Sequence, residues 1–377
     1  MRSVLIYADT VRAPELRHEI PHAVADPLLY GEVEGRRFTV LRSLEAARMR
    51  ELEGFEVVPE EELGLDDLQA GGTSVAEAHL EVALRACRRF GVDRATVPPG
   101  FPTELADYLR AAGVELTVDR DLFEQRRRKK TAAQIEGIRR AQRAADAATA
   151  AIAEMLRCAR IRGNRVFLEE APLTSERLKD AARGAVIATG CSAEDFIVAH
   201  GAQTCIGHHM GAGEIAPGEP ITVDIWPRDG ETACYSDMTR TFVVGDVDDE
   251  LREYHRLCRE ALTQALAAIR PGVLASEVHR VAAEVFEEAG QPTLLTKDPG
   301  TVLDEGFFHR LGHGVGLEVH EPPYLAPAGE AIVAGDVLAV EPGCYRQGFG
   351  GVRLEDTVLV SDDGIEVLGG YPYELQP

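Results

Sequence analysis

Residues 220–243 read PITVDIWPRDGETACYSDMTRTFV, two apolar runs that are each interrupted by one aspartate. The interrupting residues are Asp224 and Asp237, and the dipeptide Asp229-Gly230 between them is a common turn signal. A two-residue turn at this point would place Asp224 opposite Tyr235 and diagonal to Asp237 on one face of a hairpin. We therefore expect the two carboxylates to converge in a mostly apolar environment.

Residues 337–360, VLAVEPGCYRQGFGGVRLEDTVLV, repeat this pattern with two glutamates. Glu341 and Glu355 flank a glycine-containing loop. If that loop is centred on Gly348, the two glutamates lie directly opposite each other, with Cβ atoms about 5 Å apart. The sequence thus predicts two hairpins that each present a pair of carboxylates.

Four carboxylates that interrupt apolar strands need compensating positive charge, because burying an unpaired carboxylate is costly. Two divalent cations would balance the four negative charges. We interpret Asp224, Asp237, Glu341 and Glu355 as ligands of a dinuclear metal site.

Residues 307–321, FFHRLGHGVGLEVHE, supply histidines to the same region. His309, His313 and His320 stand among glycines, which break a helix and permit close approach of the backbone. The spacing is therefore not that of a helical His-Glu-x-x-His zinc site, which also needs a glutamate that is missing here. One zinc ion held by the three histidines is an alternative, although it leaves the four carboxylates unexplained.

The length of 377 residues suggests two domains. Residues 1–122 alternate short apolar runs with helical patterns, and we expect a small α/β domain there. A basic run at residues 126–130 precedes the capping-box pattern Thr131-x-x-Gln134, which opens a long helix at the start of the second domain. In the first domain we expect strands at 4–8, 38–41, 95–97 and 114–118 and helices at 74–90 and 103–112, and in the second domain helices at 250–269 and 276–289.

The composition bears on compartment and partners. With 40 Lys+Arg against 63 Asp+Glu, the net charge of −23 disfavours nucleic acid and anionic membranes as partners. The seven cysteines include no Cys-x-x-Cys pair, as is usual for reduced thiols, and no apolar stretch is long enough for a membrane span. We expect a cytoplasmic protein.

These motifs resemble a known family, the pita-bread metallopeptidases, which comprise methionine aminopeptidase, aminopeptidase P, prolidase and creatinase. The resemblance covers residues 126–377, while residues 1–122 are similar to the creatinase/prolidase N-terminal domain. It implies an α+β fold, a pita-bread catalytic domain with a smaller α/β domain before it. The motifs that carry it, in the order of the family, are Asp224, Ser236-Asp237-Met238-Thr239-Arg240-Thr241, Gly312-His313-Gly314-Val315-Gly316, His320-Glu321, Glu341-Pro342-Gly343 and Arg353-Leu354-Glu355-Asp356.

The resemblance implies a role for each matching residue. Asp224 would bind one metal ion, His313 and Glu341 would bind the other, and Asp237 and Glu355 would bridge the two. Carboxylate ligands with one imidazole suit Mn²⁺, and Co²⁺ or Zn²⁺ can occupy the same ligands. His208 or His209 takes the place of a substrate-side histidine, and we prefer His208.

The implied mechanism is hydrolysis by a water that the two cations activate. Glu341 would take the proton of this water and later pass it to the leaving nitrogen. His320 and His309 would donate hydrogen bonds to the reacting groups, and Arg353 would hold charge behind the ligands.

The interval from Glu341 to Glu355 is short, as in prolidase. We therefore expect an Xaa-Pro dipeptidase acting on proline-containing dipeptides or short peptides, with an Xaa-Pro aminopeptidase acting on longer peptides as the alternative. A non-catalytic pita-bread binding module and a creatinase-type hydrolase are further alternatives, but such proteins lack the full ligand set. We also expect a homodimer, because a neighbouring chain would wall off one side of the cleft.

Overall fold

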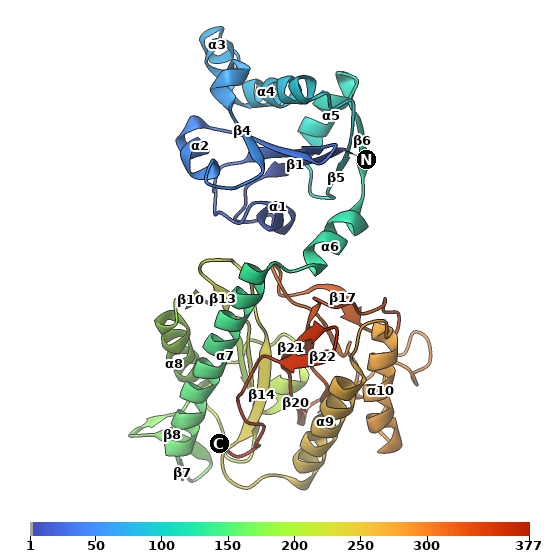
Figure 1. Cartoon of the computed structure of the whole chain (residues 1–377). Coiled ribbons are helices and arrows are strands. Elements are labelled where there is room, and N and C mark those ends of the chain that lie inside the picture. The colour runs from blue at the N-terminus through green and yellow to red at the C-terminus, as the bar shows by residue number, and fades with distance from the viewer. Residues whose placement is uncertain (1–2) are drawn as a thin grey trace. The chain divides into compact units, whose positions relative to one another are not determined.

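The computed structural model describes residues 3–377 and divides the chain into two compact units, Met1–Arg127 and Arg128–Pro377 (Figure 1). The boundary expected from the sequence, between residues 122 and 126, falls within helix α6 (Arg120–Arg128). Each unit has hydrophobic clusters of its own.

The first unit is built on a mixed six-stranded sheet with the order β4-β3-β2-β1-β5-β6. Its strands are β1 (Ser3–Ala8), β2 (Leu28–Val33), β3 (Arg36–Leu41), β4 (Phe55–Pro59), β5 (Arg94–Val97) and β6 (Glu115–Val118). Its helices before α6 are α1 (Pro14–Glu19), α2 (Ser43–Met49), η1 (Glu60–Leu63), α3 (Leu65–Ala70), α4 (Val75–Phe90) and α5 (Thr103–Ala111). The strands and helices predicted here are confirmed. The sequence analysis missed β2, β4 and the shorter helices.

The second unit contains several small sheets, three of which bear on the site. They have the orders β11-β12-β14, β17-β16-β18-β21-β22 and β15-β19-β20. The strands of this unit are β7 (Arg160–Arg162), β8 (Arg165–Leu168), β9 (Ala171–Pro172), β10 (Cys191–Ser192), β11 (Ile197–His200), β12 (Pro220–Ile225), β13 (Arg228–Asp229), β14 (Met238–Val243), β15 (Glu305–Gly306), β16 (Gly312–Gly314), β17 (Glu321–Leu325), β18 (Val337–Val340), β19 (Gly343–Arg346), β20 (Gly350–Arg353), β21 (Asp356–Ser361) and β22 (Gly364–Val367). Its helices are α7 (Ala132–Cys158), α8 (Ser175–Ala188), η2 (Gly201–Cys205), α9 (Asp249–Ala268) and α10 (Ala275–Glu288).

Two helix pairs flank the strands of the second unit, with α7 and α8 on one side and α9 and α10 on the other (Figure 1). Helix α7 begins at the predicted capping box, in which Gln134 N donates to Thr131 Oγ1 and Thr131 N donates to Gln134 Oε1. Each helix pair buries its apolar side chains against the nearest strands. The expected α+β architecture is confirmed, and the strand ends that carry the acidic residues lie between the two helix pairs.

The first predicted hairpin has a different register from the one expected. Asp224 of β12 pairs with Thr239 of β14, not with Tyr235. The prediction was wrong because the tip is longer than two residues: Ala233 N donates to Asp229 O. The Asp229 carboxylate accepts hydrogen bonds from Thr232 N and Thr232 Oγ1 at 2.8 and 2.7 Å and stabilises this longer loop.

The second predicted hairpin has the expected register. Val340 pairs with Asp356 and Gly343 pairs with Arg353, so Glu341 and Glu355 stand opposite each other between these pairs. Gly348, at the centre of the loop, has φ +78°, a left-handed conformation that favours glycine. The glutamate pairing is therefore confirmed.

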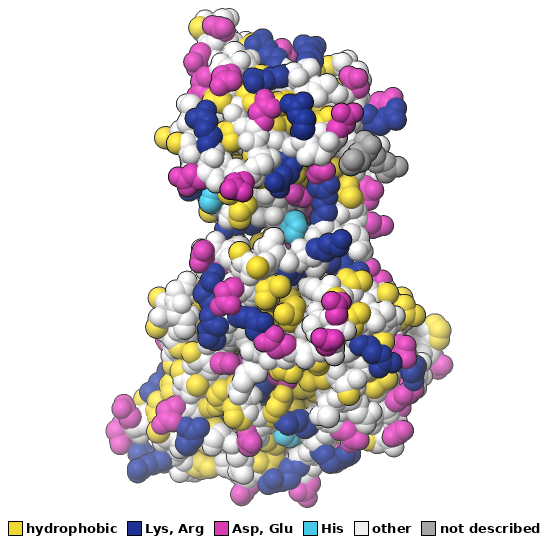
Figure 2. All heavy atoms as spheres, in the orientation of Figure 1, with side chains coloured by type: hydrophobic (Ala, Val, Ile, Leu, Met, Phe, Trp, Pro, Cys, Tyr) yellow, Lys and Arg dark blue, Asp and Glu magenta, His cyan; other side chains and the backbone are white. Residues whose placement is uncertain are grey.

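On the face of the molecule drawn in Figure 2, Lys and Arg side chains are interspersed with Asp and Glu side chains. Charges of both signs therefore share this face, although the chain as a whole is strongly acidic. None of the helices formed by residues 3–377 is both long enough and apolar enough to cross a bilayer.

Candidate metal centre

A cavity of about 650 Å³ opens in the second unit where the two hairpins and the histidine segment meet. All nine residues that we singled out from the sequence line it: Asp224, Asp237, His208, His309, His313, His320, Glu341, Arg353 and Glu355. The topology thus brings together side chains that are far apart in the chain.

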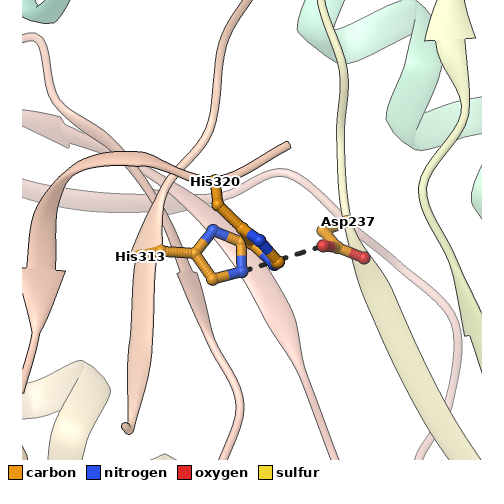
Figure 3. A group of neighbouring side chains, drawn as sticks. All are labelled: Asp237, His313 and His320. Atoms are coloured by element: carbon orange, nitrogen blue, oxygen red, sulfur yellow. Dashed lines mark ion pairs between the residues drawn. The ribbon is translucent and has the colours of Figure 1, made fainter. Parts of the chain in front are cut away.

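Three overlapping groups of these side chains could each hold a cation. Their possible ligand atoms lie within 4.8 Å of one another in the groups Asp224/Asp237/Glu355, His313/Glu341/Glu355 and Asp237/His313/His320. Figure 3 shows the third group, in which the His313 ring faces the Asp237 carboxylate and His320 lies beside it. Asp237, Glu355 and His313 each belong to two of these groups, and of the three only the two carboxylates have two oxygens with which to contact two cations.

Backbone hydrogen bonds fix the segments that carry the glutamates. Glu341 N donates to Leu311 O at 2.7 Å, and Glu355 N donates to Thr239 O at 3.0 Å. Thr239 Oγ1 also donates to Glu355 Oε2 at 2.7 Å. Glu355 is therefore held to β14, the strand that follows Asp237.

The carboxylates perturb one another because they are buried together. Burial and the charges of Glu355, Asp224 and Glu341 raise the pKa of Asp237 well above its usual value. Burial and the charges of Glu341 and Asp224 do the same to the pKa of Glu355. Burial raises the pKa of Glu341 to about 7, with Asp224 adding to the effect and Arg353 opposing it. The cluster carries more negative charge than the protein alone compensates.

The donors that face the cluster fit divalent cations. Within the described residues, Asp237 Oδ1 is buried without a hydrogen-bond partner. His313 Nδ1 donates to Gly314 O at 3.1 Å, so the neutral ring turns its Nε2 lone pair toward Glu341 Oε1 and Asp237 Oδ2, at 3.7 and 3.8 Å. Burial and the neighbouring His320 lower the pKa of His313 to about 3, which keeps the ring neutral. A lone pair facing two carboxylates is an arrangement that a cation stabilises.

Arg353 is the buried cation among the carboxylates. Its guanidinium donates to Asp224 Oδ2 through one terminal nitrogen and to Tyr345 Oη at 3.3 Å through the other. It also lies 3.9 Å from Glu341 Oε2. Arg353 therefore contacts two of the four acidic residues through its guanidinium.

His309 has a different environment from the one its predicted role requires. Its Nδ1 donates to Arg310 O at 2.7 Å, so the neutral ring accepts at Nε2 from Tyr345 Oη, at 3.0 Å. Burial and the charge of Arg353 lower the pKa of His309 to about 3, so the ring has no second proton to donate. His309 is therefore placed to orient Tyr345.

The alternative of one zinc ion held by three histidines is wrong for the described residues. His313 and His320 pack edge to face with ring centroids 4.2 Å apart, but His309 joins neither of them in a ligand group. His208 and His209 are the two candidates for the substrate-side histidine. His208 lines the cavity, whereas His209 Nδ1 accepts a hydrogen bond from Gly211 N.

Among the further residues that line the cavity, the sequence analysis missed Trp226, Arg310 and Tyr345 as functional candidates. Tyr345 lies in strand β19 and Trp226 directly follows strand β12, and neither has a distinguishing sequence signal, because aromatic residues in or beside strands are ordinary core residues. Arg310 stands between His309 and the glycines of the histidine segment, and a lone cation at that place was the available signal.

Comparison with known proteins places this geometry in context. The model of one protein family, described as metallopeptidase family M24, matches residues 136–362. The matched segment includes the four acidic residues and the three histidines of residues 307–321.

The probable dipeptidase PepE of Mycobacterium tuberculosis is 32% identical over 270 residues, which are 70% of this chain and 64% of that protein. The Xaa-Pro dipeptidase of Pyrococcus furiosus is 35% identical over 187 residues, 48% of this chain and 49% of that protein. The matched regions thus span about half to two thirds of these relatives. Among solved structures, an Xaa-Pro dipeptidase from Bacillus anthracis superposes with a TM-score of 0.78 at 23% identity, covering 99% of this chain and 94% of the other.

Proposed function

The chain belongs to metallopeptidase family M24, and from this premise we propose that it is a metal-dependent Xaa-Pro dipeptidase. The membership agrees with the resemblance seen in the sequence and with the pita-bread fold. The observation that carries the proposal is the set of four convergent carboxylates and the His313 lone pair at the wall of a cavity large enough for a dipeptide. The names of the relatives point to the same substrates.

Asp224, Asp237, His313, Glu341 and Glu355 would hold two divalent cations. Four carboxylates and one imidazole favour Mn²⁺, with Co²⁺ and Zn²⁺ as substitutes. The chemistry that bound cations supply is a lowered pKa of a water molecule and a polarised scissile carbonyl.

The protein's own groups would move the protons and position the substrate. Glu341 accepts the proton of the attacking water and delivers it to the leaving nitrogen. At the exposed side of the cavity, His320 donates a hydrogen bond to the charge that develops on the reacting groups in the transition state, and His208 donates one to the substrate. Arg353 holds Asp224 in place, and His309 orients the Tyr345 hydroxyl.

The preference for dipeptides rests on Arg310. Its side chain is exposed in the cavity and stacks on the Tyr324 ring, with its guanidinium 4.8 Å from the ring centroid. Within residues 3–377 it forms no ion pair with a carboxylate. A dipeptide has a free carboxylate one residue beyond the scissile bond, and a guanidinium binds that group well. A longer peptide has a neutral amide at the same place.

The test compares Ala-Pro with Ala-Pro-Ala, using protein loaded with Mn²⁺. We expect rapid cleavage of Ala-Pro, poor cleavage of Ala-Pro-Ala, and a raised KM for Ala-Pro in Arg310→Gln. The exposed Arg270→Gln is the control and keeps the wild-type KM. Equal cleavage of both peptides would identify an aminopeptidase, and no cleavage of either would refute the peptidase proposal in favour of a binding module or a creatinase-type hydrolase.

We further propose that the enzyme is a cytoplasmic homodimer. All seven cysteines are free thiols, which supports a reducing compartment. A second chain at the open side of the cavity would limit the length of the substrate. Light scattering on the full chain distinguishes a dimer from a monomer.

A further inference from the structure

The sequence analysis assigns no function to the basic run at residues 126–130, but the structure gives several of its side chains specific partners. Three of its members, Arg126, Arg128 and Lys130, form ion pairs with distant parts of the chain. Arg126 contacts Glu19 and Glu32 within the first unit, both at 2.9 Å. In the second unit, the side chains of Arg128 and Lys130 are only 3% and 4% exposed. Such burial of a charged side chain calls for a specific partner.

The partner of Lys130 is Glu321. Lys130 Nζ donates to Glu321 Oε1 at 2.5 Å, and the Glu321 side chain is only 2% exposed. The two residues are separated by most of the second unit in sequence, since Lys130 precedes helix α7 and Glu321 begins strand β17. Removing one member of such a buried pair takes away a charge partner of the other, so the other member cannot stay where it is without cost.

Glu321 is the residue directly after His320, and it is tied to the strand of His313. Its backbone pairs with Gly314 in β16, next to His313. The ring of His320 packs edge to face on the ring of His313, and both belong to the ligand group with Asp237 (Figure 3). A shift of Glu321 therefore moves the backbone that carries His320.

The backbone between His313 and His320 packs closely against the Lys130–Glu321 ion pair. A Cβ on Gly316 would lie 2.4 Å from Glu321 Oε1 and 2.8 Å from Lys130 Cε, so the main chain lies directly against the ion pair. Gly316 O accepts a hydrogen bond from Tyr235 N at 2.7 Å, two residues before Asp237. The Lys130–Glu321 pair is thus packed against segments that carry three of the residues in the centre.

We propose that Lys130 is a positioning residue that acts through Glu321 to hold His320 over the reacting groups. This inference rests on the proposed function, because it assigns the consequence of the ion pair to turnover. A displacement of about 1 Å in a positioned group costs up to 100-fold in rate. Lys130 does not reach the cavity itself, so its effect is on kcat and not on the binding of substrate or metal.

The test uses Lys130→Met and Glu321→Gln in the full chain. We expect kcat for Ala-Pro to fall about 10- to 100-fold in each variant, with KM and the metal content by elemental analysis unchanged. The double variant loses no more than either single variant, because both act through one contact. Lys130→Arg keeps the charge and recovers most of the kcat, which also supplies a folded variant if Lys130→Met does not fold.

The matched control is Arg128→Met, from the same run. Arg128 is equally buried and is held by Asp336, at 2.9 and 2.7 Å, and by Glu330, but neither partner adjoins a histidine. We expect Arg128→Met to lower the melting temperature without changing kcat. If Lys130→Met and Glu321→Gln lower the melting temperature but keep the wild-type kcat, the proposal is overturned.

A second readout separates this proposal from the proposed function. In Zn²⁺-loaded protein labelled with ¹⁵N-histidine, the ring signals of His320 and His313 shift in Lys130→Met and stay in place in Arg128→Met. If the wild type does not cleave Ala-Pro, the proposed function fails, and the ring signals still decide the position of His320. Unshifted His320 signals in Lys130→Met refute the positioning role whatever the activity.

Discussion

Replacing Glu341 by glutamine should stabilise the metal-free protein while abolishing its activity. Burial, reinforced by Asp224 and opposed by Arg353, raises the pKa of Glu341 from 4.5 to about 7. The side chain is only 20% exposed, so solvent screens it little. A difference of one in pKa corresponds to about 1.4 kcal/mol, so ionised Glu341 destabilises the metal-free fold by about 3 kcal/mol above pH 7.

The sign of the pH dependence follows from the direction of this change. The folded state binds the proton more tightly than the unfolded state, so the stability that this one group contributes is fully present below pH 4.5 and is lost as the pH rises through about 7. Glu341→Gln has no carboxylate to ionise at this position and lacks this part of the loss. The difference between variant and wild type should therefore be small at pH 4.5 and about 3 kcal/mol in favour of the variant at pH 8.

The assay is urea unfolding of chelator-treated protein at several pH values. Trp226, the single tryptophan, lines the cavity and reports on this unit by fluorescence. Glu288→Gln, at an exposed site on α10, is the control and should follow the wild type at every pH. If metal-free Glu341→Gln is less stable than the wild type at pH 8, the carboxylate cluster is not the source of repulsion that we describe.

Three further predictions test other parts of the structure. Asp237→Asn should lose metal and turnover, since a neutral amide cannot bridge two cations; elemental analysis and an Ala-Pro assay check this, and retained metal contradicts the bridging role. His320→Ala should keep its metal and lose about 10²–10³-fold in kcat, whereas loss of metal would make it a ligand. Burial lowers the pKa of His200, but the hydrogen bond and charge of Glu219, whose Oε2 lies 2.8 Å from His200 Nδ1, outweigh burial and raise that pKa overall. The same contact lowers the pKa of Glu219. The pair therefore stabilises the fold most between about pH 4.5 and 6.5, so thermal melts of Glu219→Gln should differ from the wild type most in that range and least at pH 8.

The sequence predicts the glutamate pairing because both sides of that hairpin are symmetric about Gly348. The aspartate hairpin was not predictable in the same way. Its register depends on hydrogen bonds from Thr232 to the Asp229 carboxylate, and Asp229 is also paired with Arg140 of helix α7 at 2.8 Å. A partner that comes from a distant helix cannot be predicted from the local sequence of the hairpin.

The same limit explains the basic run and the role of His309. Lys130 has no assigned role in the sequence, because its partner Glu321 is brought to it only by the fold. His309 looks like a donor to substrate until Tyr345 and the carbonyl of Arg310 occupy both ring nitrogens. Charged residues that interrupt apolar strands could be found from sequence, whereas the neighbours that decide what each one does could not.

The hydrogen bonds between Glu355 and Thr239 have a consequence for folding kinetics. They join residues that are 116 positions apart, and Thr357 Oγ1 closes a similar distance to Asp237 O. Contacts of such high sequence separation form only after long loops have closed, which is slow. No short segment of the chain carries enough of the proposed ligands to bind a cation before the fold forms, so metal should not speed folding. It should instead slow unfolding, since the unfolding barrier must break a centre that only the finished fold assembles. Added metal would then lengthen the lifetime of the native state and leave the refolding rate unchanged.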